Sequence, residues 1–258
     1  VSENTTSWGK DLPGWNGAPG GRDLQATMLR ELAQVDGIDR LRLMYLQPAE
    51  LRPELLEAMA EVPEVAPYFD LSLQHVSAWV LTRMARSGSP ERFGRLLARI
   101  RELAPDIAIR STFIIGFPGE TEEDVEQLEA FLDEHELDWV GLFPFSREDG
   151  TPSDDLPDQV DPDVARARVE RIASVQERAA DRAAAKHLGR TVDVLVEEHV
   201  ADPATGATVE VVGRSPREAP DTDGEVRLVG PDGQPIDAPV GRMVRAEVVD
   251  QEGVDLVA

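Results

Sequence analysis

The chain contains no cysteine, which excludes disulfide bonds, thiolate metal sites, a cysteine nucleophile and cysteine ligation of an iron–sulfur cluster by these residues. It has four histidines, none at the H-x-x-x-H spacing of a metal site, so a metal centre built from this chain alone is not expected. No apolar run approaches the roughly 18 residues that cross a bilayer, and the first residues do not resemble a secretory signal. We therefore expect a soluble, cytoplasmic protein.

Positive charge is also scarce, and the formal net charge is −24. Such a charge repels phosphate, whereas proteins that bind nucleic acid usually carry a basic surface. Basic partners are therefore favoured over nucleic acid. A second interpretation stays open, namely that the acidity only reflects the general composition of proteins in the source.

The larger part of the chain, residues 1–186, alternates helical periodicity with short apolar runs, the pattern of strand and helix units around a parallel sheet. This predicts an α/β domain. The acidic, proline-containing segment 148–162 has no periodicity and is expected to be a loop, and a long helix is expected to follow it to about Lys186. The expected strands are 41–46, 68–73, 107–115 and 139–145.

The pattern changes near His187, where short β-type runs separated by Gly, Pro and Asp begin. About five such strands predict a small antiparallel barrel over residues 187–258. This region holds six Arg against fifteen Asp and Glu, a local charge of −9. The expected strands are 191–196, 208–212, 225–229, 243–249 and 254–257.

The segment from Arg110 to Thr121 reads RSTFIIGFPGET, a buried strand that enters a Gly-Pro-Gly turn and then a helix. Gly116 and Gly119 allow positive φ or a close approach of the backbone to a ligand, and the helix start offers free N–H groups. Thr121 with Asp124 resembles a capping box. The competing interpretation is an ordinary turn between a strand and a helix.

Two further clusters lie at the carboxyl ends of predicted strands, where barrel enzymes place their sites. Gln74 and His75 end the segment YFDLSLQH, although they could equally cap the strand by local hydrogen bonds. In the segment FPFSREDGT, Phe143 or Phe145 could stack on a flat ring, and core packing is the alternative for either residue alone.

Together with the opening SENTTSWGKD, the ordered set SLQH, FIIGFPGET and FSREDGT resembles the radical S-adenosylmethionine methylthiotransferase family. That family has an N-terminal domain with its own cluster, a radical S-adenosylmethionine barrel opened by C-x-x-x-C-x-x-C, and a small β-barrel called TRAM. The resemblance implies a partial radical S-adenosylmethionine (β/α) barrel over 1–186 and a TRAM domain over 187–258. The cysteine motif and the upstream domain are missing, and the chain starts with Val1. We therefore expect the later portion of such an enzyme, inactive alone.

Residues 213–224, GRSPREAPDTDG, resemble the TRAM motif of the family branch that modifies ribosomal protein S twelve, with Asp221 where that branch often has Glu. The acidic TRAM region agrees with a basic protein partner. The resemblance implies that a 5′-deoxyadenosyl radical takes hydrogen from the β-carbon of an aspartate, where a methylthio group is installed. The tRNA-modifying branch, or a non-catalytic module that binds a ribosomal partner, remain as alternatives.

The resemblance also implies the cofactors, S-adenosylmethionine and two 4Fe–4S clusters whose ligands are not in this chain. By that resemblance, Glu3 and Asn4 would bind the methionine amino end, and Gln74 and Arg110 would contact the ribose or the carboxylate. Gly116, Phe117 and Phe143 would line the adenine side. No catalytic residue and no metal ligand is assigned. The expected cofactor-binding residues are Glu3, Asn4, Gln74, Arg110, Gly116, Phe117 and Phe143.

Overall fold

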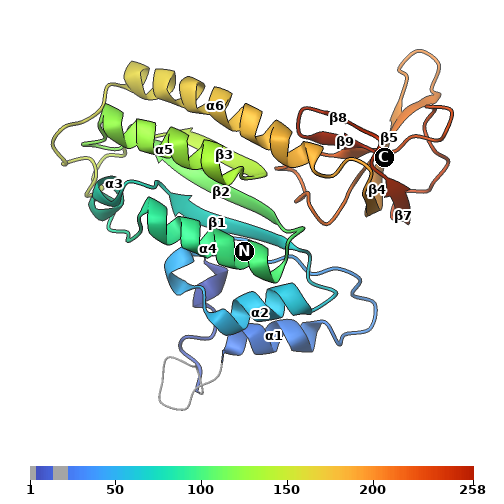
Figure 1. Ribbon diagram of the computed structural model, residues 1–258, viewed down its shortest axis with the longest axis horizontal. Coiled ribbons are helices and arrows are strands. Elements are labelled where there is room, and N and C mark those ends of the chain that lie inside the picture. The colour runs from blue at the N-terminus through green and yellow to red at the C-terminus, as the bar shows by residue number, and fades with distance from the viewer. Residues whose placement is uncertain (1–3, 14–22) are drawn as a thin grey trace. The chain divides into compact units, whose positions relative to one another are not determined.

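The computed structural model describes residues 4–13 and 23–258, and Figure 1 shows the order of its elements. The chain divides into two compact units, Val1–Gln176 and Glu177–Ala258. The division falls within the long helix α6 (Pro162–Ala185). The domain boundary expected at 186/187 stays a prediction.

The first unit is built on a parallel sheet of three strands in the order β1 (Tyr68–Gln74), β2 (Ala108–Ile115) and β3 (Trp139–Pro144). The connections are helical, as parallel strands require. α4 (Pro90–Leu103) and α5 (Glu122–His135) lie against one face of this sheet (Figure 1). The α/β class predicted for this region is confirmed.

Burial alternates along β2 and separates the two faces of the sheet. Ile109 and Phe113 are buried in the core that the helices α4 and α5 complete. Arg110, Thr112 and Ile114 point to the opposite face and are only partly buried. This second face is called the open face below.

The ends of the covering helices follow from local sequence. Thr121 accepts a hydrogen bond from the backbone of Asp124, whose side chain accepts one from the backbone of Thr121, so the expected capping box is confirmed. At the start of α4, Ser89 accepts from the backbone of Arg92, and Pro90 occupies the first turn.

The strand expected at 41–46 is wrong as a regular strand. The segment makes only two parallel bridges among the described residues, Leu41 with Val65 and Leu46 with Leu71. Tyr45 has φ of 60° and donates its N–H to the carboxylate of Asp70 instead of to a neighbouring strand. The remaining elements of this unit are η1 (Thr5–Ser7), α1 (Leu24–Leu32), η2 (Pro48–Glu50), α2 (Pro53–Glu61) and α3 (Ala78–Arg83).

The second unit is a curled sheet of six strands in the order β7-β4-β5-β6-β9-β8. All pairs are antiparallel except β6 with β9, which run parallel, and the short β8 was not expected from the sequence. Valines and leucines from several strands fill its core. The strand bounds are β4 (Thr191–Ala201), β5 (Thr208–Arg214), β6 (Val226–Arg227), β7 (Met243–Glu247), β8 (Asp250–Glu252) and β9 (Asp255–Val257).

The segment 213–224 begins with the last two residues of β5 and continues as a loop that is buried around Glu218 and exposed from Pro220 to Thr222. Glu218 is fully buried, and its carboxylate accepts hydrogen bonds from the backbone and the hydroxyl of Ser215. Asp223 accepts from the backbone N–H of Ala219. At Gly213 an added Cβ would lie 2.2 Å from the carbonyl oxygen of Leu195 on β4. The motif therefore shapes the fold of this unit.

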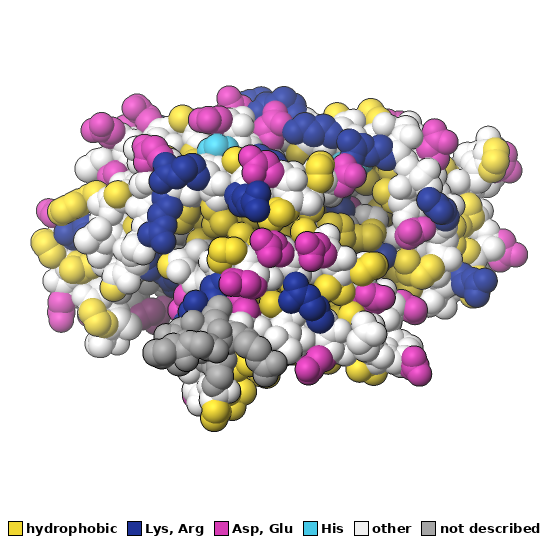
Figure 2. All heavy atoms as spheres, turned by 60° about the horizontal axis from the view of Figure 1, so that its bottom comes forward, with side chains coloured by type: hydrophobic (Ala, Val, Ile, Leu, Met, Phe, Trp, Pro, Cys, Tyr) yellow, Lys and Arg dark blue, Asp and Glu magenta, His cyan; other side chains and the backbone are white. Residues whose placement is uncertain are grey.

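Acidic side chains are spread over the face shown in Figure 2 and are interspersed with arginines and lysines. Within 4–13 and 23–258, none of the helices has the length and apolar character that a membrane span needs.

Gly213→Ala should destabilise the second unit by about 3 kcal/mol, because the new methyl group meets rigid backbone between two paired strands. The matched control is Gly230→Ala, where the added Cβ would lie 3.1 Å from the end of the Asp232 side chain and at an ordinary 3.6 Å from the carbonyl oxygen of Gln234, and a loss below about 1 kcal/mol is expected. Urea unfolding of the 258-residue chain measures both. Equal losses would show that the β4–β5 contact is not tight.

Candidate functional site

Three of the expected site residues lie where parallel strands end. Gln74 is the last residue of β1 and pairs with Phe113 of β2, Gly116 follows the last residue of β2, and Phe143 is the penultimate residue of β3. Arg110 lies nearer the amino end of β2, three positions before Phe113. At the usual rise this separates its Cα by ~10 Å from the level of Gln74.

On the open face, Phe143 is adjacent to Ile114, with which it pairs across β2 and β3. Phe143 is 53% exposed, so an aromatic face is available for stacking. Phe117 is different, because it is buried and packs edge-on against Phe145 with ring centroids 5.0 Å apart. Arg110 and Phe143 thus reach one face of the sheet, while Phe117 supports the turn from inside.

The turn over residues 116–119, Gly-Phe-Pro-Gly, needs both of its glycines. Gly116 has φ of 81° and Gly119 has φ of 83°, which side chains rarely tolerate. An added Cβ would also lie 2.5 Å from Cβ of Ala165 at the first position and 2.7 Å from Nε of Arg83 at the second. The chain's own residues fill the space beside both glycines. The interpretation as a tight structural turn is therefore supported, and no ligand is needed to explain either glycine.

Arg83 fastens this turn to its surroundings. Its Nε donates to the carbonyl of Pro118 at 2.6 Å, and its Nη2 donates to that of Pro157 at 2.9 Å. Its guanidinium also lies over the ring of Trp79, whose Nε1 donates to the carbonyl of Gly119. The turn is fixed on its outer side by α3.

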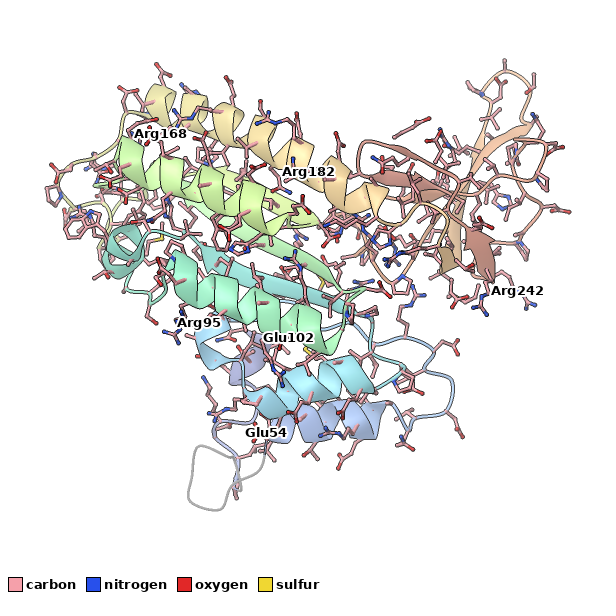
Figure 3. All side chains as sticks on the ribbon, viewed as in Figure 1. Glu54, Arg95, Glu102, Arg168, Arg182 and Arg242 are labelled. Atoms are coloured by element: carbon pink, nitrogen blue, oxygen red, sulfur yellow. The ribbon has the colours of Figure 1, made fainter. Side chains whose placement is uncertain are left out.

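A buried polar network fixes the inner side. Glu120 accepts from the backbone of Gly116 at 2.8 Å through Oε2 and from Nη1 of Arg168 at 2.8 Å through Oε1. Nε2 of His75 lies 3.5 Å from the same Oε2, and the side chains of His75 and Glu120 are both 0% exposed. Arg168 reaches this network from α6 (Figure 3).

The tautomer of the neutral His75 ring follows from its neighbours. Its Nδ1 accepts a hydrogen bond from the backbone N–H of Ser77, so in the neutral ring the proton resides on Nε2, which faces Glu120. The hydroxyl of Ser77 donates to Asp124 at the start of α5. Burial alone raises the pKa of Asp124, but hydrogen bonds from Ser77 and Thr121 outweigh it and hold the pKa below its usual value. The segment that follows β1 is thus in contact both with the turn after β2, through His75, and with the start of α5, through Ser77.

Asn4 is held by a different carboxylate. Its Nδ2 donates to Ser7 Oγ at 2.8 Å and to Glu50 Oε2 at 3.1 Å, and its Oδ1 accepts from Thr6. Lys10 forms a salt bridge of 2.7 Å with the same Glu50 oxygen. Both polar ends of the Asn4 amide are therefore engaged within the chain. Glu3 lies outside the described residues.

A polar pocket of about 380 Å³ opens beside Asn4 and the end of β1. Glu50 and Arg86 bring charges of both signs to its wall, and Arg86 donates to Gln47 Oε1 at 2.9 Å. Sequence reasoning missed all three of these residues. They occur singly in unremarkable segments, and only the fold brings them to Asn4.

The donor chemistry of the chain does not fit an iron–sulfur cluster. There is no cysteine in the sequence, and the described residues place no group of three or more His, Asp or Glu where a metal ion could be held. S-adenosylmethionine is a better match, since the exposed Phe143 ring beside Ile114 suits an adenine, and a pocket beside β1 offers Glu50 and Arg86 for charged groups.

Comparison with known proteins assigns families to both parts of the chain. Residues 19–132 match the radical SAM superfamily, and residues 188–258 match the TRAM domain. The chain therefore combines part of a radical S-adenosylmethionine domain with a TRAM domain. Among solved structures, the radical S-adenosylmethionine methyltransferase TsrM from Kitasatospora setae aligns over 46% of this chain and 24% of its own, with 20% identity and a TM-score of 0.39.

Curated relatives named ribosomal protein uS12 methylthiotransferase RimO align with the whole chain. The identities are 50% for the protein of Nocardioides sp., 47% for that of Streptomyces avermitilis and 48% for that of Saccharopolyspora erythraea. The whole chain is therefore similar to these methylthiotransferases, with a radical S-adenosylmethionine match over residues 19–132 and a TRAM match over residues 188–258. It spans about half the length of these relatives, 51%, 49% and 49% respectively.

Arg168→Ala should lower the free energy of unfolding by about 3 kcal/mol, because it leaves the buried Glu120 carboxylate without its cation. Arg166→Ala is the matched control on the same helix, where the exposed pair with Asp163 should contribute less than about 0.5 kcal/mol. Denaturant unfolding followed by circular dichroism compares the two. Equal losses in the two variants would show that the buried network around Glu120 stabilises the fold no more than an exposed ion pair does.

Glu50 should make stability depend on pH. Burial raises its pKa, but hydrogen bonds from Lys10, Ser7 and Asn4 outweigh this and hold the pKa below its usual 4.5. The unfolded chain therefore binds this proton more readily. The stabilisation is complete above the unfolded pKa and is lost as the pH falls through the lower, folded value.

Accordingly, Glu50→Gln should cost about 1 kcal/mol at neutral pH, and the difference from the unchanged chain should shrink as the pH falls through the lowered pKa of Glu50. Urea unfolding at several pH values measures it. Glu54→Gln, at an exposed carboxylate of α2 (Figure 3), controls for the loss of one negative charge. If Glu50→Gln cost the same free energy in acid as at neutral pH, the ionised form of the Glu50 carboxylate would not be what stabilises the fold.

Proposed function

We propose that this chain is the later portion of a methylthiotransferase that modifies the β-carbon of an aspartate in ribosomal protein uS12. The observation that carries the proposal is the alignment of the whole chain, at 50% identity, with a curated relative named for that activity. The reaction replaces a C–H bond by a C–S bond to a methylthio group. The enzyme is proposed to act in the cytoplasm, where ribosomes are modified.

The partner is proposed to be reached through the TRAM domain. Residues 187–258 carry a net charge of −9, which attracts a basic ribosomal protein and repels the phosphates of tRNA. The proposed boundary between this domain and the radical S-adenosylmethionine domain is 186/187, just past the last residue of α6.

The proposed site for S-adenosylmethionine lies on the open face and at its carboxyl edge. Phe143 offers an exposed ring for the adenine, and Gln74 and Arg110 supply polar groups for the ribose or the carboxylate. Gly116 and Phe117 contribute through the shape of the turn. The methionine end is proposed to lie toward the pocket of Asn4, with Glu3 beside it in sequence.

The division of labour follows from the residues present. Bound S-adenosylmethionine would supply the reactive group, while the clusters that activate it need cysteines that this chain does not carry. The residues of this chain bind and orient the cofactor, and the buried network around Glu120 keeps the turn in one position. This chain alone is therefore proposed to be inactive.

The test uses the complete polypeptide encoded by the gene, with both clusters reconstituted without oxygen. It is incubated with S-adenosylmethionine, a reductant, a sulfur source and purified uS12, and the intact mass of uS12 is measured. The expected result is a gain of one methylthio group in place of one hydrogen, located on an aspartate by fragmentation. Unmodified uS12 together with methylthiolated tRNA would transfer the activity to the tRNA branch.

Gln74→Ala and Arg110→Ala in the complete enzyme test the cofactor site. Each is expected to weaken S-adenosylmethionine binding about tenfold, the loss of one or two hydrogen bonds to a polar ligand. Equilibrium dialysis measures the affinity, and Thr27→Ala on α1 serves as the control. Unchanged affinity in both variants would remove these residues from the site.

A further inference from the structure

A groove of about 520 Å³ lies on the outer surface of the TRAM sheet. Residues of β5, β6, β8 and β9 contribute to its wall, and a loop between β6 and β7 forms one side. That loop is a tight hydrogen-bonded turn, in which Gly230 donates to Gln234 and Gly233 donates to Gly230, and Val229 bridges to Pro235. Hydrogen-bonded backbone therefore forms one side of the groove.

The floor of the groove is apolar and in part strongly exposed. Val209 is 53% exposed and Val249 is 63% exposed, whereas Val194, Val211 and Val226 of the same unit are fully buried in its core. Leu228 and Val257 complete the floor from below. Exposed aliphatic side chains that gather in a concave surface gain free energy when a partner covers them.

The rim of the groove is acidic. Glu210 and Asp250 line it, and Glu252 lies beside them on β8. One cation, Arg227, is shared between Glu210 at 3.6 Å and Glu252 at 2.5 Å. Near the rim, burial and then the charges of Asp255 and Glu210 raise the pKa of Glu225, a sign that the carboxylates here repel each other. An added cation relieves this repulsion.

We propose that this groove binds an extended segment of the ribosomal protein in which a Lys or Arg side chain lies in the floor. Its aliphatic stem covers Val209 and Val249, and its charged end meets Asp250 and Glu252 at the rim. This inference rests on the proposed function, since it takes a basic ribosomal protein as the partner. An RNA segment would bring phosphates to the carboxylates and is disfavoured.

The test is a binding titration of the 258-residue chain with fluorescently labelled uS12, followed by anisotropy. The groove variant combines Val249→Ser with Asp250→Lys. The matched control combines Val240→Ser with Asp237→Lys, which changes an exposed valine and an exposed aspartate of the same unit outside the groove. Both variants change the net charge equally, and all four positions are exposed, so unchanged unfolding midpoints check the fold.

The groove variant is expected to weaken uS12 binding at least about tenfold, whereas the control should change it less than about threefold. Added salt should weaken the unchanged chain more than the groove variant. Equal losses in the two variants would show that only the overall charge matters, which overturns the inference. Binding of tRNA in place of uS12 would also overturn it.

The same substitutions in the complete enzyme separate this inference from the proposed function. If uS12 is methylthiolated and the groove variant leaves the KM for uS12 unchanged, the groove is not the docking site for uS12 and the proposed function stands. If uS12 is not modified even by the unchanged enzyme, the proposed function has failed. A raised KM with unchanged kcat, in the groove variant alone, supports a docking role.

Discussion

The buried carboxylate of Glu120 is the contact on which the first unit depends most. It holds the backbone of the turn after β2, the guanidinium of Arg168 on α6 and the approach to His75 at the end of β1. A carboxylate without exposure is tolerated only when its partners compensate the lost hydration. Because those partners come from three separate segments, their contacts with Glu120 also fix how the segments meet. They thereby fix the carboxyl edge of the sheet, where the proposed cofactor site lies.

Much of the first unit could be predicted from sequence because its signals are local. The helix caps at Ser89 and Thr121 and the apolar stripes of α4 and α5 are set by residues within one or two turns. The segment 41–46 shows the limit of such signals. Its apolar pattern favours a strand, but a long-range bond from Tyr45 to Asp70 and a positive φ interrupt the pairing, and neither leaves a trace in the local pattern.

The candidate site was predicted less completely for the same reason. The sequence identified segments at strand ends, yet the direction of each side chain depends on neighbours far along the chain. Phe117 and Phe143 both belong to such segments, but the first packs on Phe145 inside and the second is exposed on the open face. Glu50 was missed because its partners, Asn4 and Lys10, precede it by about forty residues, and no local pattern joins them.

In the second unit, the motif over residues 213–224 acts through the fold. Glu218 and Ser215 are buried and bond to each other, and Gly213 lets β5 approach β4, so this part of the motif does not offer a surface to a partner. In the proposed docking mode, recognition depends on side chains that the motif supports but does not contain. Those are exposed, acidic and aliphatic on the adjoining sheet, as at Val249 and Asp250. A motif can therefore mark a binding preference while the residues that carry the preference lie elsewhere on the domain.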